Sequence, residues 1–504
     1  MNIAVVTSRA QDGISAPQVK VEVHISNGLP SFSLVGLPET SVREAKDRVR
    51  SAIINGGFEF PMRRITVNLA PADLPKNGGR YDLAIAIGVL VASCQIDSNL
   101  INGKEFVGEL GLNGEVRFCS GLLPAIVASL DANTEFIMPY ANLNDNYIVQ
   151  HDKVFLMKSL SDLKDALSNV DQNIDFTEQF LPNSKSYIDM NEIVGQASAK
   201  KALEIAAAGG HNLLMIGSPG TGKSMLANAF LGIMPLLTKE QALEVASIAS
   251  IANINRKKED FYTKPFRNPH HTSSSSSLVG GGSIPMPGEI SLAHLGVLFL
   301  DELPEFPRKV LDSLREPLET KEVKISRARY KATFPAKFQL IAAMNPSPCG
   351  NIDHQARSSF NEIRRYLSRL STPFLDRFDL SVDVPRLPKG LLASSSAGSG
   401  ESSDLIRQRV IAVQARQMAR QGVLNFELSS KFIRNNNFFK QNDLVFLEET
   451  IIKLKLSVRS FYRILKVALT IADLLEIKPN KDSIIQALNY RAADKLIFKI
   501  HENM

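Results

Sequence analysis

Three short apolar runs without a charged residue lie in the middle of the chain, at 213–216, 296–300 and 338–344. Uninterrupted apolar runs of this length are typical of strands that are buried on both faces of a parallel sheet. Helical spacing follows the first run, over 225–231. Because open parallel sheets bind ligands at the carboxyl ends of their strands, the pattern predicts an α/β domain with a site after these runs.

The two ends of the chain carry different patterns. The first part interleaves short strands with helical stretches, whereas apolar positions recur at helical spacing over most of 404–501. In the first part, strands are expected at 19–25, 65–68, 106–110 and 136–139, and helices at 41–55, 81–93 and 122–130.

We therefore expect a multidomain α/β protein with a helical C-terminal part. A polar stretch without a sustained period reads as a linker, and a Ser/Gly/Ala tract reads as a flexible hinge. The expected division is an N-terminal domain at 1–168, a linker at 169–187, a nucleotide-binding core at 188–388, a hinge at 389–403 and a helical lid at 404–504.

Composition narrows the function classes. With 504 residues, 44% hydrophobic and 22% charged, the chain resembles ordinary soluble proteins, and its net charge of +6 suits an anionic partner such as nucleic acid. The longest nearly uncharged apolar stretch, 83–94, is too short to cross a bilayer, so we expect a cytoplasmic protein with no membrane partner. Three scattered cysteines argue against a disulfide framework or a thiolate zinc site.

A phosphate-binding loop follows the first apolar run. Such a loop turns backbone N–H groups toward the phosphates of a nucleotide at a helix N-terminus. Its lysine reaches the β and γ phosphates, and its hydroxyl completes the Mg²⁺ shell, so the sequence predicts that ATP and Mg²⁺ bind here. The loop consists of Gly217, Ser218, Pro219, Gly220, Thr221, Gly222, Lys223 and Ser224.

The second and third apolar runs end on acids and an amide. Asp301 is expected to hold Mg²⁺, and Glu302 to orient and activate the attacking water, so the pair favours hydrolysis over simple binding. Asn345 suits a group that senses the γ-phosphate or positions the water, although an Asn before a proline is also common in a plain turn.

Longer motifs carry a resemblance to a known family. They read FRNPHHT at 266–272, LVGGG at 278–282, PGEISLAH at 287–294 and AAMNP at 342–346. With the phosphate loop and the helical lid, the chain resembles AAA+ proteins, and in particular the magnesium-chelatase-like ComM (YifB) group. The resemblance implies a homo-hexameric DNA motor that promotes branch migration in natural transformation, with DNA and recombination proteins as its partners.

Two arginines gain roles from this resemblance. Arg377, in the run PFLDRFD at 373–379, matches the arginine finger, which reaches the γ-phosphate held by a neighbouring subunit. Arg459 matches the second sensor arginine on the lid. Without the resemblance, each arginine would be read as a partner in a surface salt bridge.

The N-terminal domain resembles the proteolytic domain of Lon, a ribosomal S5 domain 2-like fold, through LPKNGG at 74–79 and GELGLNGEV at 108–116. Lon proteases use a serine nucleophile that is activated by a lysine base. The matching positions here are Arg80 and Leu123, so the catalytic dyad is absent and no peptidase activity is expected. A DNA-binding or assembly role is the alternative use of this scaffold.

Two segments are expected to contact DNA as pore loops. The first, from Lys264 to about 288, carries basic and imidazole side chains, and the second, 322–334, alternates like a hairpin with basic residues at every second position. An edge hairpin protected by charge is the alternative for the second segment. The expected contacts are Lys264, Arg267, His270, His271, Arg327, Arg329 and Lys331.

Two other functions compete with the DNA motor. One is a chelatase-type or protein-remodelling ATPase that does not translocate DNA, and the other is an ATP-dependent protease, which the missing dyad disfavours. Stimulation of ATP hydrolysis by DNA separates the motor from the remodelling ATPase.

Overall fold

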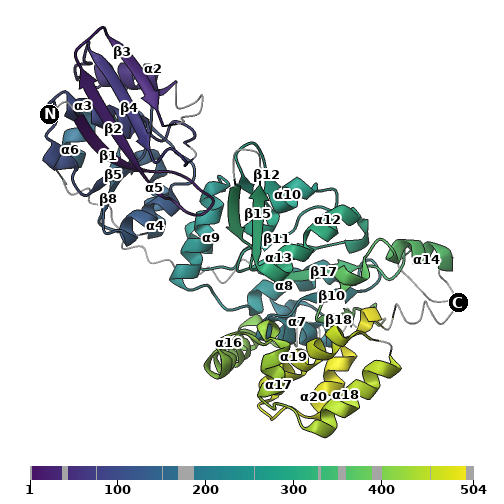
Figure 1. Cartoon of the computed structure of the whole chain (residues 1–504). Coiled ribbons are helices and arrows are strands. Elements are labelled where there is room, and N and C mark those ends of the chain that lie inside the picture. Colours follow the sequence, from purple (N-terminus) through teal and green to yellow (C-terminus); the bar gives the residue numbers. More distant parts are fainter. Residues whose placement is uncertain are drawn as a thin grey trace.

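The computed structural model describes residues 3–36, 44–74, 76–149, 151–168, 187–254, 256–326, 331–349, 359–388, 400–454, 456–494 and 496. Within these ranges the chain forms an N-terminal α/β part, a central α/β part and a C-terminal helical part, which lie in a row (Figure 1). Of the expected linker and hinge, only Tyr187 and residues 400–403 are described.

The N-terminal part is built on a seven-stranded mixed sheet of order β3-β4-β2-β1-β5-β8-β9. Its strands are β1 (Ile3–Arg9), β2 (Gln18–Ser26), β3 (Ser31–Val35), β4 (Arg64–Ala70), β5 (Lys104–Phe106), β8 (Glu135–Pro139) and β9 (Val154–Met157). Three of its helices are α2 (Ala45–Asn55), α3 (Asp82–Ala92) and α4 (Leu123–Asp131).

Helix α3 explains the long apolar stretch in this part. All eleven of its residues are buried, because the helix packs against β1, β2 and α2. A helix that is apolar all round is buried in a protein core as readily as in a membrane. Among the described helices, none combines the length and the apolar character that crossing a bilayer requires.

The central part is an open, fully parallel sheet of order β11-β14-β17-β10-β18. Its strands are β10 (Leu213–Ile216), β11 (Phe266–Arg267), β14 (Val297–Leu300), β17 (Gln339–Met344) and β18 (Leu380–Asp383). The three apolar runs of the sequence are the three adjacent strands β14, β17 and β10, and every residue in them is buried. A parallel α/β sheet with a C-terminal helical region is thus confirmed.

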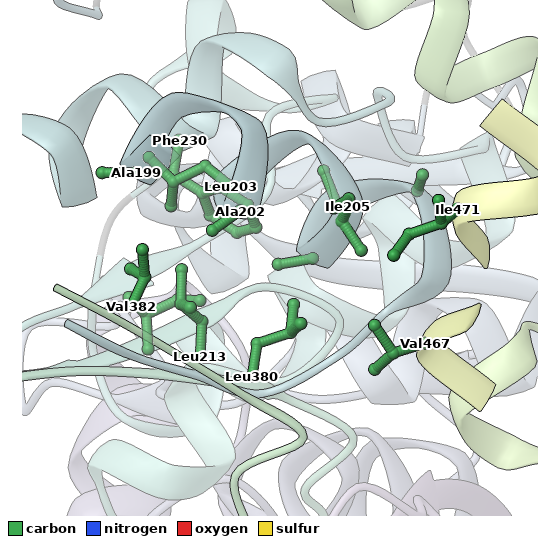
Figure 2. Close-up of a cluster of buried hydrophobic side chains, with 14 of the residues drawn as sticks. Ala199, Ala202, Leu203, Ile205, Leu213, Phe230, Leu380, Val382, Val467 and Ile471 are labelled. Carbon is green, nitrogen blue, oxygen red and sulfur yellow. The ribbon is translucent and has the colours of Figure 1, made fainter. Parts of the chain in front are cut away.

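The C-terminal helices share one hydrophobic core with the central sheet. Helix α7 (Ala197–Gly209) covers the sheet, and Figure 2 shows its Ile205 in one cluster with the sheet residue Leu380 and the lid residues Val467 and Ile471. The lid helices are α16 (Ser403–Gln421), α17 (Ser430–Asn435), α18 (Gln441–Lys453), α19 (Val458–Leu475) and α20 (Lys481–Asn489). The lid is therefore fixed on α7 by buried apolar side chains.

The N-terminal part is also packed onto the central part. Helix α9 (Lys239–Ile251) belongs to the central part, but its Val245 and Ala246 are buried in one apolar cluster with Leu122 and Ile126 of the N-terminal part. At the end of α9, the backbone N–H of Gly121 donates to the carbonyl of Ser250 at 3.2 Å. Apolar burial, which is non-directional and grows with area, holds the two parts together.

Candidate functional site

The phosphate loop connects the buried strand β10 to helix α8 (Lys223–Ile233). Gly220 and Gly222 have φ angles of +77° and +90°, which glycine adopts without strain, and nothing lies within 4 Å of where their Cβ atoms would be. The loop therefore leaves an open cradle on its inner side. Helix α8 starts at this cradle, so its N-terminal N–H groups and dipole favour an anion there.

Lys223 points into this cradle and is held by oxygen atoms. Its Nζ lies 2.7 Å from the carbonyl oxygen of Gly217, 3.0 Å from that of Ser218 and 3.1 Å from Oδ1 of Asn345. Burial lowers the pKa of Lys223, while Asp301 and Glu302 raise it. The structure thus brings the loop lysine and the amide at the end of β17 together, 122 positions apart in sequence.

The two expected Mg²⁺ ligands are in contact. The Ser224 hydroxyl donates to Oδ2 of Asp301 at 2.6 Å, across the gap between α8 and the end of β14. A hydroxyl beside a carboxylate oxygen is a donor set that Mg²⁺ accepts together with waters and phosphate oxygens. The residues therefore fit a magnesium nucleotide, with Ser224 and Asp301 holding the ion.

Glu302 follows Asp301 in the chain, but its side chain contacts a different residue. Its φ of +52° places it in the left-handed region, and its backbone N–H donates to Oδ1 of Asp301 at 2.9 Å. Its side chain is 57% exposed, and its Oε2 lies 3.2 Å from Nδ1 of His271. An unusual backbone conformation at a position expected to be catalytic fits a side chain whose direction matters for function.

His271 thereby lies beside Glu302, a contact that the sequence did not predict. Its ring lies 4.1 Å from that of His270 and meets Phe306 edge to face at 6.4 Å. The histidine pair follows strand β11, which is hydrogen-bonded to β14, the strand that ends at Asp301. This strand neighbourhood brings His271 to Glu302.

Arg377 and Arg459 lie at the opposite end of the sheet. Both line one cavity of about 690 Å³, together with Asn212 at the start of β10 and Asp379 before β18. The phosphate loop leaves β10 at its other end, after four residues, or about 13 Å of strand. In this arrangement, neither arginine faces the phosphate loop of its own chain.

Two of the expected DNA contacts, Lys264 and Arg267, are bonded to groups of their own chain, which corrects the expectation that both face DNA. Lys264 is partly buried, and its Nζ donates to the carbonyl of Leu295 at 3.1 Å. Arg267 belongs to β11 and forms two hydrogen bonds to the Glu289 carboxylate, at 2.6 and 2.8 Å. The reason is that the central sheet continues through this segment as its edge strand.

The remainder of the first segment packs against the second. The second segment forms the hairpin β15 (Glu322–Ser326) and β16 (Lys331–Pro335), and Ile325 contacts Gly280 of the first segment. Lys331 and His270 are exposed. Arg327 and Arg329 lie outside the described residues, so their role stays a prediction.

In the N-terminal part, the two positions that match the Lon dyad lie on adjoining segments. Arg80 is buried and donates to the carbonyl of Ser120 at 2.7 Å, three residues before the buried Leu123. The Nη1 atom of Arg80 is buried without a hydrogen-bond partner. The Lon-like assignment stays a prediction.

The phosphate loop predicted which residues bind the phosphates of a nucleotide, but no motif predicted which residues bind its base. Gln196, whose φ is +52°, donates to the carbonyl of Thr221 in the phosphate loop at 3.3 Å. The residues just before it, Ile193 to Gly195, line a cavity of about 360 Å³ with Ile406 of the lid. Four charged side chains, Lys200, Lys201, Glu204 and Glu401, also line it, so a nucleotide base in this cavity would meet both apolar and charged groups. No pattern described in the sequence predicted this position.

Comparisons with known families match nearly the whole chain. The family model described as magnesium chelatase, subunit ChlI, matches residues 189–392. The model described as subunit ChlI of Mg-chelatase matches residues 21–142, and the model of the ChlI C-terminal region matches residues 400–491. The three matches fall on the N-terminal part, the central part and the lid.

Two individual relatives match over nearly the full length, and a third matches a part of the chain. The chain is 49% identical to Competence protein ComM of Haemophilus influenzae, over 99% of both proteins. It is 47% identical to the uncharacterized protein YifB of Salmonella typhimurium, over 100% of this chain and 99% of YifB. It is 26% identical to the magnesium-chelatase 38 kDa subunit of Cereibacter sphaeroides, over 40% of this chain and 59% of that subunit.

Proposed function

The chain belongs to the ComM and YifB family of magnesium-chelatase-like AAA+ proteins, and on this premise we propose that it is an ATP hydrolase that works as a ring-forming DNA motor. The proposed role is branch migration during the recombination of incoming DNA. The full-length similarity to a protein named for competence supports this role.

ATP hydrolysis is proposed from the contacts around the phosphate loop. Lys223 is already surrounded by oxygen atoms and exchanges them for the β and γ phosphates when ATP binds. Ser224 and Asp301 would hold a Mg²⁺ ion, which would supply positive charge against the phosphates. Glu302 accepts a proton from the attacking water, and Asn345 helps to orient the γ-phosphate.

One observation supports a ring: the expected site residues are divided between the two ends of the central sheet. The loop, the acids and Asn345 stand at the carboxyl ends of the strands, while Arg377 and Arg459 stand at the amino ends. Since an arginine stabilises transition-state charge only by contact, both must act on nucleotide held by a neighbouring subunit. In a closed homo-hexamer, every nucleotide site has a neighbouring subunit that supplies both arginines.

DNA is proposed to pass along the hairpin β15–β16 and the segment that packs against it. Lys331 is exposed on the hairpin, and Arg327 and Arg329 precede it in the sequence at spacing two. Basic residues at spacing two along a strand share a face and match the repeat of a phosphate backbone. The partly buried Lys264 and the paired Arg267 are left out of this surface.

A chelatase-type or protein-remodelling ATPase is the second candidate. It is favoured by the family model of the magnesium chelatase subunit, which matches the central part and the start of the hinge. Such an enzyme would share the hydrolysis site and the ring, but it would have no reason to respond to DNA.

One experiment separates the two candidates. ATP turnover is measured with the full chain alone, with single-stranded DNA and with forked DNA, and particle mass is measured by light scattering with and without ATP. We expect DNA to raise turnover severalfold and ATP to produce particles of six subunits. Turnover that is unchanged by every DNA would reject the motor in favour of the remodelling ATPase.

A further inference from the structure

The guanidinium of Arg377 is held inside its own subunit. Its side chain is 14% exposed, its Nη2 is paired with the carboxylate of Glu319, and its Nη1 lies 3.4 Å from the carbonyl of Pro373. The Nε atom is buried without a partner. An arginine in this position does not project toward a neighbouring molecule.

The backbone around Arg377 is fixed independently of its side chain. The Asn212 side-chain amide donates to the carbonyl of Arg377 at 2.9 Å. From the lid, Arg463 donates to the carbonyl of Phe378 at 3.2 Å and pairs with Asp376 at 3.1 Å. Because these contacts hold the loop on both sides of Arg377, its side chain can swing out while the loop stays in place.

Before Arg377 can reach a neighbouring subunit, it must give up its ion pair with Glu319, and this ion pair is weak. The Glu319 side chain is 62% exposed, and exposed ion pairs shift equilibria by roughly twofold to fivefold. Glu319 thus competes for the same guanidinium as the γ-phosphate of the neighbour. We propose that Glu319 is a latch that keeps the finger arginine in its own subunit until DNA is engaged. This rests on the proposed function and adds its regulation.

The position of Glu319 in the fold connects the latch to DNA. Glu319 is on helix α13 (Arg315–Thr320), which passes through Lys321, with φ of +62°, directly into strand β15 of the hairpin. Movement of the hairpin therefore moves the end of helix α13, which carries Glu319. DNA bound along the hairpin draws Glu319 away and leaves Arg377 free for the neighbouring γ-phosphate.

The test uses mixed rings in which only the finger is measured. Subunits with Arg377→Ala have an intact hydrolysis site but no finger, and subunits with Glu302→Gln have a finger but no turnover. Phosphate release by an equimolar mixture then reports fingers donated by the Glu302→Gln subunits. Three donors are compared: Glu302→Gln alone, with Glu319→Gln, and with Glu316→Gln, which makes the same charge change one turn earlier on α13.

Without DNA, we expect the Glu319→Gln donor to give twofold to fivefold more phosphate release than the other two donors. With saturating DNA, the three donors are expected to give equal rates. Equal rates without DNA, or a lower rate with the Glu319→Gln donor, would overturn the latch while leaving the finger assignment intact. If no donor restores turnover in mixtures that copurify through different tags, the finger assignment itself fails, and the latch falls with it.

Discussion

Lys264 was expected to contact DNA, but the burial of its charge lowers the free energy of unfolding. Burial, and to a smaller extent Lys337, lowers the pKa of Lys264 to about 8, whereas the unfolded chain binds this proton up to about 10.4. The unfolded state therefore binds more protons between these values, so the free energy of unfolding rises with pH across this window. Below pH 8, Lys264 is charged in both the folded and the unfolded state, so burial of its charge lowers the free energy of unfolding by the full amount.

The variant Lys264→Met should remove this cost. We expect it to raise the free energy of unfolding at pH 7 by about 1–3 kcal/mol and to abolish the rise between pH 8 and 10. Thermal unfolding midpoints at pH 7 and 9.5 measure both effects, with Lys257→Met at an exposed lysine as the control. An unchanged pH dependence in Lys264→Met would show that the lysine is not desolvated.

Glu302 and Lys223 should fail in different ways. Glu302→Gln keeps the shape of the side chain but loses the base, so turnover should fall at least about 100-fold while ATP still binds. Lys223→Ala removes the charge that faces the β and γ phosphates, so ATP binding itself should weaken. Binding of a fluorescent ATP analogue and phosphate release separate the two outcomes, and near-normal turnover in Glu302→Gln would refute its role.

At the scale of elements, the hairpin β15–β16 is the clearest candidate for a DNA contact. Its inner side is anchored by Val323 and Phe334 in the core of the central part, while Lys331 faces outward. We expect replacement of Arg327, Arg329 and Lys331 by Ala to spare basal ATP turnover and to remove its stimulation by DNA. The slope of log affinity against log salt should fall by about two for single-stranded DNA.

A matched control makes the same charge change elsewhere. Three exposed lid lysines are replaced by Ala, and DNA stimulation and the salt slope are expected to stay as in the unmodified chain. If the hairpin variant behaves like this control, the hairpin is a charged edge and not a DNA contact. The control positions are Lys440, Lys453 and Lys478.

Elements buried on both faces were predictable from sequence, and short or edge elements were not. The runs that became β10, β14 and β17 are uncharged and, apart from Gln339, apolar, because both faces of each strand are covered. By contrast, β11 has two residues and β18 reads LSVD, so neither leaves a period of its own. The strand expected at 106–110 is divided, because the sheet strand ends at Phe106.

For the site, motif residues on one loop were predictable, whereas contacts made by packing were not. The spacing of the phosphate loop and the acids after β14 indicated a nucleotide site from sequence alone. The approach of His271 to Glu302 depends on which strand lies beside β14, and the shared cavity of Arg377 and Arg459 depends on how α19 packs on α7. Such facts belong to tertiary structure.

At the scale of the whole molecule, three successive parts of the chain are held as one body by apolar packing. The lid shares a core with α7 and the central sheet, and the N-terminal part shares one with α9. A second contact places Gly13, with φ of +57°, against the Thr333 carbonyl of the hairpin β15–β16. The N-terminal part thus touches both the central part and the hairpin proposed to meet DNA.

The shared core at α9 changes where such a protein can be cut and rejoined. A chimera that joins two relatives in the segment 169–187 would separate Leu122 and Ile126 from the residues Val245 and Ala246 with which they were selected. A crossover placed after the end of α9 at Ile251 keeps these partners on the same parental sequence. The same crossover, however, separates β10 and its phosphate loop from β17 and β18, to which β10 is hydrogen-bonded, so neither position leaves all buried partners on one parental sequence.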